Sequence, residues 1–457
     1  MRSLRSTLTL SLIFLSSSLC AASDNSPLVT SDLPPDTQAT ISAAIRGNDA
    51  ATAPTKGPWA QLAQPVATAD QSGFYFGTSV AVSGNVMVVG ELYTFTGSGV
   101  GEALVFIRPK TGGLNNWTQS AVLVPSDGLD TDLFASSVAI SGNTIVVGSP
   151  PSCNTCGPGR AYVYVEPAGG WSGTLTETAE LTASDGTNGA ALGSSVSISS
   201  DTVVAGAPGE MPGWAYVFVK PASGWVSGTQ TAKLTASNGV AGNQLGVSVS
   251  ISGGTVVAGA PLATKTNPPG AAYVFREPAG GWKDMTESAT LTASDGASFD
   301  QLGQAVAISG DTVVAGAPSA MGRTARSGAA YIFEKPAGGW KNMTQTAKLA
   351  APDGQKYDVF GSAVAISGAT VVSGASQRSP GWLNSRGYPA WWLAGGTYVF
   401  TKSGSGWTKA SVQVLNGSDA HNDDLMGSSV AISGDLVVTG APKLGKYLGA
   451  AFVFVKH

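Results

Sequence analysis

The sequence predicts an all-β fold, a seven-bladed β-propeller whose blades are four-stranded antiparallel sheets. Three observations support this prediction: a segment that recurs along the chain, four short apolar runs in each copy, and turn residues between the runs. Self-similarity at a nearly fixed period is typical of repeat architectures. The seven copies are 53 to 66 residues apart and are anchored at Gly77, Ala135, Gly193, Gly246, Gly303, Gly361 and Gly427.

Each copy divides into four expected strands, and the fifth copy illustrates them. The four runs are Ala305–Ser309, Thr312–Ala317, Ala329–Glu334 and Thr346–Ala351. A glycine-containing dipeptide separates the first two runs, which is a strong hairpin signal between apolar, β-rich segments. A Pro-Ala-Gly-Gly-Trp turn separates the third and fourth. We therefore expect each copy to form one antiparallel meander.

A single meander cannot bury both of its faces, but seven arranged radially can. The first two strands carry small residues that suit a crowded centre, and the third carries bulky ones that fill a widening wedge. Trp59–Asp70 resembles a fourth strand without a blade, and Ala451–Val455 is a third strand without a fourth. We expect the N-terminal strand to complete the last blade, which would remove exposed sheet edges.

The repeats resemble the FG-GAP family, whose repeats also form the propeller in the head of integrin α subunits. Phe-Gly pairs carry the resemblance at Phe76-Gly77 and Phe360-Gly361, with Leu-Gly versions at Leu192-Gly193 and Leu302-Gly303. Gly-Ala-Pro triplets follow at Gly206, Gly259, Gly316 and Gly440. The resemblance covers about residues 59–457 and implies the propeller fold. It implies no particular ligand, because members of the family bind diverse partners and a fold does not determine function.

The N-terminal segment 1–22 is typical of a secretory signal peptide. Arg2 and Arg5 form a basic start, Leu8–Leu19 an apolar centre, and small residues follow. A bacterial lipoprotein signal at Cys20 is the alternative, although Leu19 is an unusual residue to precede it. Residues 23–58 are rich in Ser, Thr, Ala and Pro and are expected to form a flexible leader. The prediction is a secreted, extracellular or cell-surface protein, with the periplasm as the alternative.

The charge of the chain indicates which partners to expect. The net charge is −4, and only 12% of the residues are charged. A mildly acidic protein is a poor match for nucleic acid. No later segment is apolar enough for a transmembrane helix. We expect a monomer whose partner is an extracellular protein or a polysaccharide.

The loops between the second and third strands vary most among the seven copies, and on a rigid scaffold such loops usually bind ligands. The longest is Ser376–Gly396. Aromatic rings with a polar group suit stacking on sugars or anchoring a protein surface. The alternative is that this loop covers the central channel and buries its own rings. The candidate ligand-binding residues in it are Trp382, Tyr388, Trp391, Trp392, Arg378 and Arg386.

The equivalent loop of the second copy contains Cys153 and Cys156. In an exported protein we expect these two cysteines to form a disulfide. The alternatives are free thiols and a metal site. A zinc site would need about four ligands, and this loop offers only the two cysteines.

Calcium has to be considered separately, because integrin-type repeats often carry loops of the form D-x-D-x-D-G. This chain departs from that pattern, and the turns between first and second strands are too short to surround an ion. We expect no cofactor, with aspartates capping their own turns as the main interpretation. Weak calcium binding is the alternative, at Asp127, Asp130 and Asp132 or at Asp419, Asp423 and Asp424.

Catalysis finds little support in the sequence. The only histidines are His421 and the terminal His457, which argues against a Ser–His or Cys–His triad. The expected function is therefore a non-catalytic binding or adhesion module. One alternative is a propeller hydrolase or lyase acting on extracellular polysaccharide, which would need facing carboxylates such as Glu91, Glu102 or Glu210. The other alternative is a purely structural surface protein.

Overall fold

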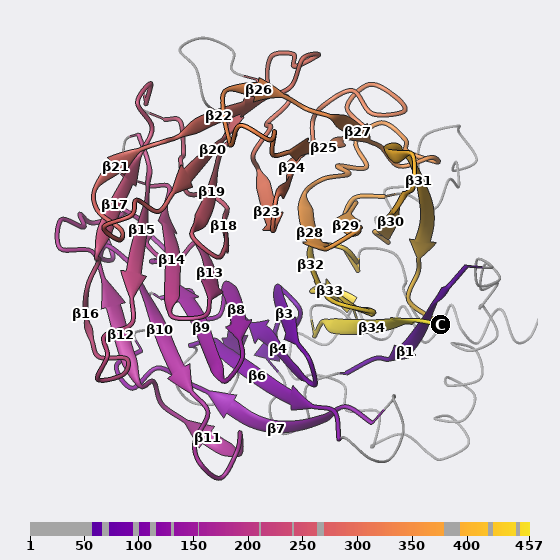
Figure 1. The fold of residues 1–457 in the computed structure, drawn as a ribbon. Coiled ribbons are helices and arrows are strands. Elements are labelled where there is room, and N and C mark those ends of the chain that lie inside the picture. The colour runs from indigo at the N-terminus through magenta and orange to yellow at the C-terminus, as the bar shows by residue number, and fades with distance from the viewer. Residues whose placement is uncertain are drawn as a thin grey trace, which may run out of the picture. The chain divides into compact units, whose positions relative to one another are not determined.

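A computed structural model shows seven β-sheets arranged radially around a central axis (Figure 1). The structure describes residues 57–65, 73–94, 100–109, 116–128, 132–153, 155–209, 212–239, 242–262, 269–378, 394–418, 424–444 and 448–457. These residues belong to one compact unit, Pro54–His457. The predicted seven-bladed propeller is confirmed. The predicted signal segment 1–22 and all but the end of the leader 23–58 lie outside the described residues.

Every blade has its first strand nearest the axis and its fourth strand at the rim. Blade one consists of β3 (Ser79–Ser83), β4 (Val86–Glu91), β6 (Glu102–Ile107) and β7 (Thr118–Leu123). Blade two consists of β8 (Ser137–Ser141), β9 (Thr144–Ser149), β10 (Arg160–Val165) and β12 (Ala179–Thr182). Blade three consists of β13 (Ser195–Ser199), β14 (Thr202–Ala207), β15 (Trp214–Val219) and β17 (Ala232–Thr235). Blade four consists of β18 (Val249–Ser252), β19 (Thr255–Ala260), β20 (Ala271–Arg276) and β22 (Ala289–Thr292).

The remaining blades follow the same order. Blade five consists of β23 (Ala305–Ser309), β24 (Thr312–Ala317), β25 (Ala329–Glu334) and β27 (Ala347–Leu349), so three of its four strands have the bounds expected from the sequence. Blade six consists of β28 (Ala363–Ser367), β29 (Thr370–Gly374), β30 (Thr397–Ser403) and β31 (Gly406–Leu415). Blade seven consists of β32 (Ser429–Ser433), β33 (Leu436–Ala441), β34 (Ala450–Lys456) and β1 (Trp59–Ala63).

The ring closes as predicted, because the N-terminal strand β1 supplies the fourth strand of blade seven. It pairs antiparallel with β34, and Trp59 lies opposite Lys456. The backbone N–H of His457 also donates to the carbonyl of Pro58 at 2.7 Å. Trp59 is buried in a cluster with residues of blades six and seven. Closure therefore joins the two ends of the propeller by both hydrogen bonds and apolar packing.

Four blades carry a fifth strand at the rim, which the sequence did not predict. The short strands β11 (Gly173–Leu175), β16 (Gly228–Thr229), β21 (Met285–Thr286) and β26 (Met343–Thr344) each precede the fourth strand of one blade. Each pairs in parallel with the fourth strand of the blade before it, as Met285 does with Leu234. The rims of blades one to four are thus each hydrogen-bonded to the blade that follows. A further two-stranded sheet pairs β2 (Gly73–Phe74) with β5 (Tyr93–Thr94).

The anchor glycine of one blade meets the glycine near the end of the second strand of the preceding blade. In blade six, the Gly361 N–H donates to the Gly374 carbonyl of its own blade at 2.9 Å. The Gly361 carbonyl packs against Gly316 of blade five, where a Cβ would lie only 1.9 Å from the oxygen. Gly361 also has a φ of +90°, which favours glycine. Equivalent contacts recur around the ring: the second-strand position is glycine in all seven blades, whereas the anchor position is Ala135 in blade two, at a φ of +64°.

Serines satisfy the inner edges of the blades. The first strand of each blade has a free edge toward the axis, and unpaired backbone N–H groups are unfavourable there. In blade five, the N–H groups of Val306 and Ile308 donate to the hydroxyls of Ser248 and Ser250 in blade four. Ser195 and Ser197 of blade three make the same bonds to blade four, so alternating serines join the first strands of blades three, four and five. The same strands line a narrow axial channel of about 220 Å³, mainly with Val, Ala and Ile side chains.

Candidate functional surface

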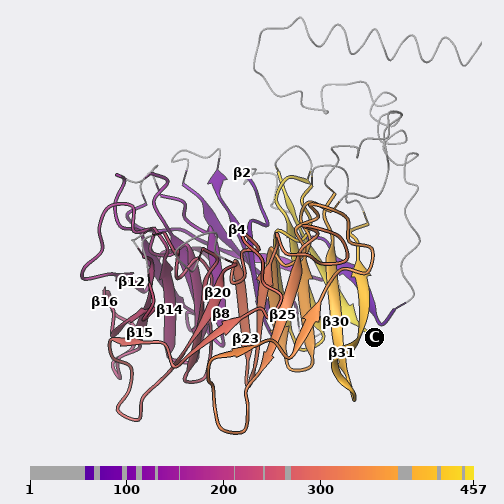
Figure 2. The same cartoon turned by 90° about the horizontal axis from the view of Figure 1, so that it is seen from above.

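The variable loops and the connections between blades lie on the same face of the propeller. Within an antiparallel blade, the end of the second strand and the end of the fourth point in the same direction. The connection that carries β2 lies at the upper edge in Figure 2, and we call this side the connection face. The turns between first and second strands and between third and fourth strands lie on the opposite face. The sequence-based assignment of loops to two faces follows from the observed strand order.

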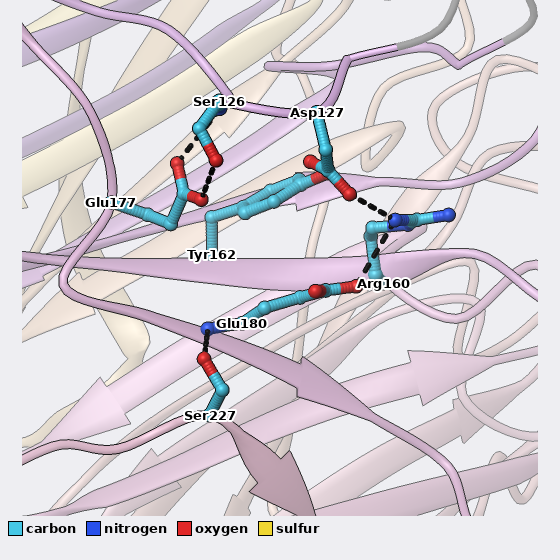
Figure 3. Close-up of polar contacts among 7 residues, drawn as sticks. All are labelled: Ser126, Asp127, Arg160, Tyr162, Glu177, Glu180 and Ser227. Carbon is cyan, nitrogen blue, oxygen red and sulfur yellow. Dashed lines mark hydrogen bonds and ion pairs between the residues drawn. The ribbon is translucent and has the colours of Figure 1, made fainter.

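A recurring polar cluster occupies the connection face where one blade joins the next (Figure 3). Between blades one and two, the Tyr162 hydroxyl donates to Asp127 Oδ1 at 2.8 Å. Arg160 Nη1 contacts the other Asp127 oxygen at 2.6 Å and Glu180 Oε1 at 3.0 Å. Both Arg160 and Tyr162 come from β10, whereas Asp127 belongs to the connection before blade two. The cluster therefore fixes the connection to the third strand that follows it.

Four other blade junctions repeat this arrangement. A tyrosine of the third strand donates to an Asp or Asn of the preceding connection, and at three of these junctions a cation contacts the second carboxylate oxygen. The tyrosine pairs are Tyr216–Asp185, Tyr273–Asn238, Tyr331–Asp295 and Tyr398–Asp353. The cation pairs are Lys233–Asp185, Lys348–Asp295 and Arg378–Asp353. Because the cluster recurs with the fold period, its role is structural.

The environment of these clusters shifts the pKa of their groups. Burial tends to raise the pKa of Asp353, but hydrogen bonds from Tyr398 and Arg378 outweigh it and lower that pKa below its usual range. Burial, followed by the bond to Asp127, raises the pKa of Tyr162. Asp353 is therefore charged and Tyr162 neutral at pH 7, which is the state that their hydrogen bonds require.

A second recurring contact joins the connections to the next blade. Ser126 donates from its N–H to Glu177 Oε2 at 2.9 Å and from its hydroxyl to Glu177 Oε1 (Figure 3). At other junctions a glutamine replaces the glutamate and exchanges two hydrogen bonds with the serine, as Gln345 does with Ser294. The serine of the Ser-Asp-Gly connection is therefore a structural residue as well.

The calcium candidates divide into three groups. Asp127 is engaged by Tyr162 and Arg160, as described above. Asp132 and Asp424 are buried, and burial raises the pKa of Asp132. Asp130, Asp419 and Asp423 lie outside the described residues. Among the described residues, no three His, Cys, Asp or Glu side chains gather as a metal site would require.

The tryptophan-rich loop is largely outside the described residues. Trp382, Tyr388, Arg386, Trp391 and Trp392 all fall in the segment 379–393. Arg378, at the start of this loop, is described. Its guanidinium contacts Asp353 at 2.7 Å and Asn416 at 3.3 Å, and it lies 5.9 Å from the Tyr398 ring. Arg378 thus belongs to the structural cluster of blade six.

Cys153 and Cys156 form a disulfide in the loop between β9 and β10. The Thr155 hydroxyl lies 3.3 Å from Cys153 Sγ. This arrangement closes a short loop on the connection face of blade two.

Two carboxylates considered for catalysis meet within blade one. Glu91 and Glu102 are direct partners in the pairing of β4 with β6. Burial raises the pKa of Glu102, and Glu91 has no exposed surface. A fully buried carboxylate cannot contact a polysaccharide in this state. Glu210 lies outside the described residues.

Two exposed aromatic residues on the connection face were missed by the sequence reasoning. Phe299 and Tyr357 are 52% and 51% exposed and stand four residues before the anchor glycines of blades five and six. The equivalent residues before blades three and four are Gly189 and Gly242. An alignment of the repeats at this position would have revealed aromatic residues in place of glycine.

Comparison with known proteins agrees with the repeat structure. A family model described as FG-GAP repeat matches residues 117–164, 175–218, 229–275, 285–333, 343–387 and 409–454, which together make up more than half of the chain. Most matches begin just before the fourth strand of one blade and end at the third strand of the next blade. Residues 59–107 contain the same four strands, β1, β3, β4 and β6. A search of curated proteins found no match.

Proposed function

Since six matching repeats show that the chain belongs to the FG-GAP repeat family, we propose that it is a non-catalytic binding or adhesion module that uses its connection face. The ligand class is an extracellular polysaccharide or protein. The signal-like segment 1–22 supports export, and we propose that the protein acts outside the cytoplasm. Among the described residues, no helix is long and apolar enough to span a membrane.

One observation carries this proposal: the differences among the repeats gather on the connection face. The motif glycines, the serines that end the first strands and most of the Asp–Tyr clusters recur from blade to blade and join the blades to one another. The loops between second and third strands differ in length and content and contribute little to these recurring contacts. Side chains that do not serve the ring are available for a ligand.

The buried position of Glu91 supports the non-catalytic reading. A retaining or inverting glycosidase needs two carboxylates that both reach the substrate. Glu91 has no exposed surface, although it lies directly opposite Glu102. A polysaccharide hydrolase or lyase that used this pair would require a change of structure here.

The test is a binding screen of the purified protein against polysaccharides and extracellular proteins, with calcium or with a chelator. The double variant Trp391→Ala/Trp392→Ala probes the connection face. Val226→Ala, in the turn between β15 and β17, is the control on the opposite face, because Val226 is 53% exposed. We expect the tryptophan variant to weaken binding by about tenfold or more and the control to leave it unchanged.

Three results would count against the proposal. Binding that is weakened by the Val226 variant alone would place the ligand on the opposite face. Turnover of a polysaccharide would favour the enzyme. Self-association with no ligand would favour the structural protein.

A further inference from the structure

Phe299 and Tyr357 adopt a backbone conformation that normally favours glycine. Their φ angles are +67° and +75°. The equivalent Gly189 and Gly242 have φ angles of +80° and +87°. Bulky residues in this region are true outliers, and such strain is found preferentially at functional sites. Two adjacent blades thus carry strained, half-exposed aromatic rings at a position where two other blades have glycine.

Neighbouring contacts hold both aromatic residues in place. The buried Asp300 accepts a hydrogen bond from the Ala297 N–H at 2.8 Å, and the buried Asp358 accepts one from the Gln355 N–H at 2.7 Å. Each aspartate directly follows its aromatic residue and closes the turn that contains it. The orientation of the backbone at Phe299 is therefore determined before any ligand binds.

The loop between β24 and β25 connects the two aromatic positions. At its start, the Ser319 N–H donates to the Asp300 carbonyl at 3.3 Å. At its end, the Arg326 carbonyl accepts from the Tyr357 N–H at 2.8 Å. Met321 in this loop is 66% exposed. The three exposed apolar side chains consequently belong to one hydrogen-bonded unit on the connection face.

Three cations lie in this unit or directly next to it in sequence. Arg323, Arg326 and Lys356 are exposed, and none makes an ion pair with a described carboxylate. The Lys356 ammonium lies 4.8 Å from the centre of the Tyr357 ring. Lys356, and more weakly Arg326, lower the pKa of the Tyr357 hydroxyl.

These cations differ from the others near the same junctions. Lys348 is paired with Asp295, and Arg378 is paired with Asp353. Three exposed cations without a described carboxylate partner are notable in a chain whose net charge is −4. Asp300 and Asp358, which directly follow the two aromatic residues, are buried, so the exposed charges of this unit are positive and complement an anionic ligand.

We propose that this surface binds an acidic polysaccharide, one built of uronic acid units. The surface, called here the blade-five surface, consists of Phe299, Met321, Arg323, Arg326, Lys356 and Tyr357. The aromatic rings stack on the apolar faces of the sugar rings, and the guanidinium and ammonium groups pair with the uronate carboxylates. Rings at two neighbouring blades contact successive parts of one extended chain. This inference rests on the proposed function and specifies its ligand and its site.

A polysaccharide fits this surface better than a folded protein does. A stable protein–protein interface buries about 800 Å² on each partner around an apolar core. The blade-five surface offers three exposed apolar side chains and three exposed cations. A chain of sugars needs only local stacking and charge pairing, repeated along its length.

The experiment measures binding of the purified protein to polygalacturonate, with neutral dextran and poly-L-glutamate as comparison probes. The main variant is Phe299→Gly/Tyr357→Gly. Glycine is the residue that the equivalent positions of blades three and four carry, so this variant keeps a backbone that the fold accepts. Phe299→Tyr/Tyr357→Phe is the matched control that keeps both rings. Thermal unfolding of each variant checks the fold.

We expect polygalacturonate to bind and dextran to bind at least tenfold more weakly. The double glycine variant should lose about tenfold or more in affinity, and the ring-keeping control should lose less than about twofold. Arg323→Gln/Lys356→Gln should weaken binding and reduce its dependence on salt, because fewer charges are then neutralised.

Several outcomes would overturn the inference. No binding of polygalacturonate would do so, as would equal binding by the folded double glycine variant. Tighter binding of poly-L-glutamate than of polygalacturonate would identify an acidic peptide as the occupant instead. The proposed function would survive each of these results if another ligand lost affinity in the Trp391→Ala/Trp392→Ala variant. The proposed function itself is overturned by the three results given with it above.

Discussion

Replacing Gly316 with alanine tests whether the motif glycines hold neighbouring blades together. Gly316 faces the Gly361 carbonyl of the next blade, and an added Cβ would lie 1.9 Å from that oxygen. Real Cβ atoms come no closer than 3.0 Å, so the backbones must separate by about 1.1 Å. Both sides of this contact are backbone, and no flexible side chain can move aside.

The expected loss of stability follows from this geometry. Overpacking a core costs about 1–3 kcal/mol even where side chains can adjust. Displacing Gly361 also weakens its hydrogen bond to Gly374, which contributes about 1 kcal/mol. We therefore expect Gly316→Ala to lower the free energy of unfolding by about 3 kcal/mol or more.

Urea denaturation followed by tryptophan fluorescence measures this change. Gly338→Ala is the matched control, because its added Cβ meets no atom within 4 Å and its φ is not in the left-handed region. The control should be neutral or stabilising by up to about 1 kcal/mol. A Gly316 variant within about 0.5 kcal/mol of the wild type would refute the reasoning that close backbone contact dictates this glycine.

Four further predictions concern closure, the rim, the polar clusters and the strained aromatic residues. Trp59→Ala should lower the free energy of unfolding by about 3–5 kcal/mol in urea denaturation, because Trp59 is 4% exposed in the closing strand; a change below about 1 kcal/mol would contradict the role of β1. Gln345→Ala removes two hydrogen bonds to Ser294 and should cost about 1–2 kcal/mol while accelerating hydrogen exchange of the Ser294 amide; unchanged exchange would argue against the contact. The pKa of Asp353 is lowered in the folded state, so its contribution to stability is present above the ordinary value of 3.8 and is lost as the pH falls below it. Unfolding measured between pH 7 and pH 3 should therefore show a smaller acid-induced loss in Asp353→Asn than in the wild type, and equal losses would contradict this assignment. Phe299→Gly should be more stable than Phe299→Ala by about 0.5–1 kcal/mol, because relief of the left-handed strain exceeds the entropy of glycine; thermal or urea unfolding of the pair gives the sign, and a more stable alanine variant would show that the strain is absent.

The functional surface was only partly predictable. Counting aromatic residues in the sequence directs attention to Trp391 and Trp392, which fall outside the described residues. Phe299 and Tyr357 are single aromatic residues in short polar connections, so the local density of aromatic residues gave no signal for them. Their importance depends on a positive φ and on exposure, two properties that belong to the folded chain.

The aspartates show a similar limit. Asp127 was interpreted as a cap of its own turn or as a weak calcium ligand, and Asp353 lies in the equivalent connection before blade six. In the structure each accepts a hydrogen bond from a tyrosine of the following blade and pairs with an arginine. The partners are 25 to 45 residues away in sequence, so local turn chemistry could not reveal them.

The sequence by itself determined the number of blades, the order of strands within them and the closure by β1. These features depend on the repeat period, on alternating apolar residues and on turn chemistry, all of which act over a few residues and recur seven times. Only the tertiary structure decided how one blade contacts the next: the contact between Gly316 and Gly361, the parallel strands at the rim, and the strained rings of Phe299 and Tyr357. Such contacts join segments whose sequences are nearly alike from copy to copy, and their pairing is defined by the ring geometry that brings each blade against its neighbour.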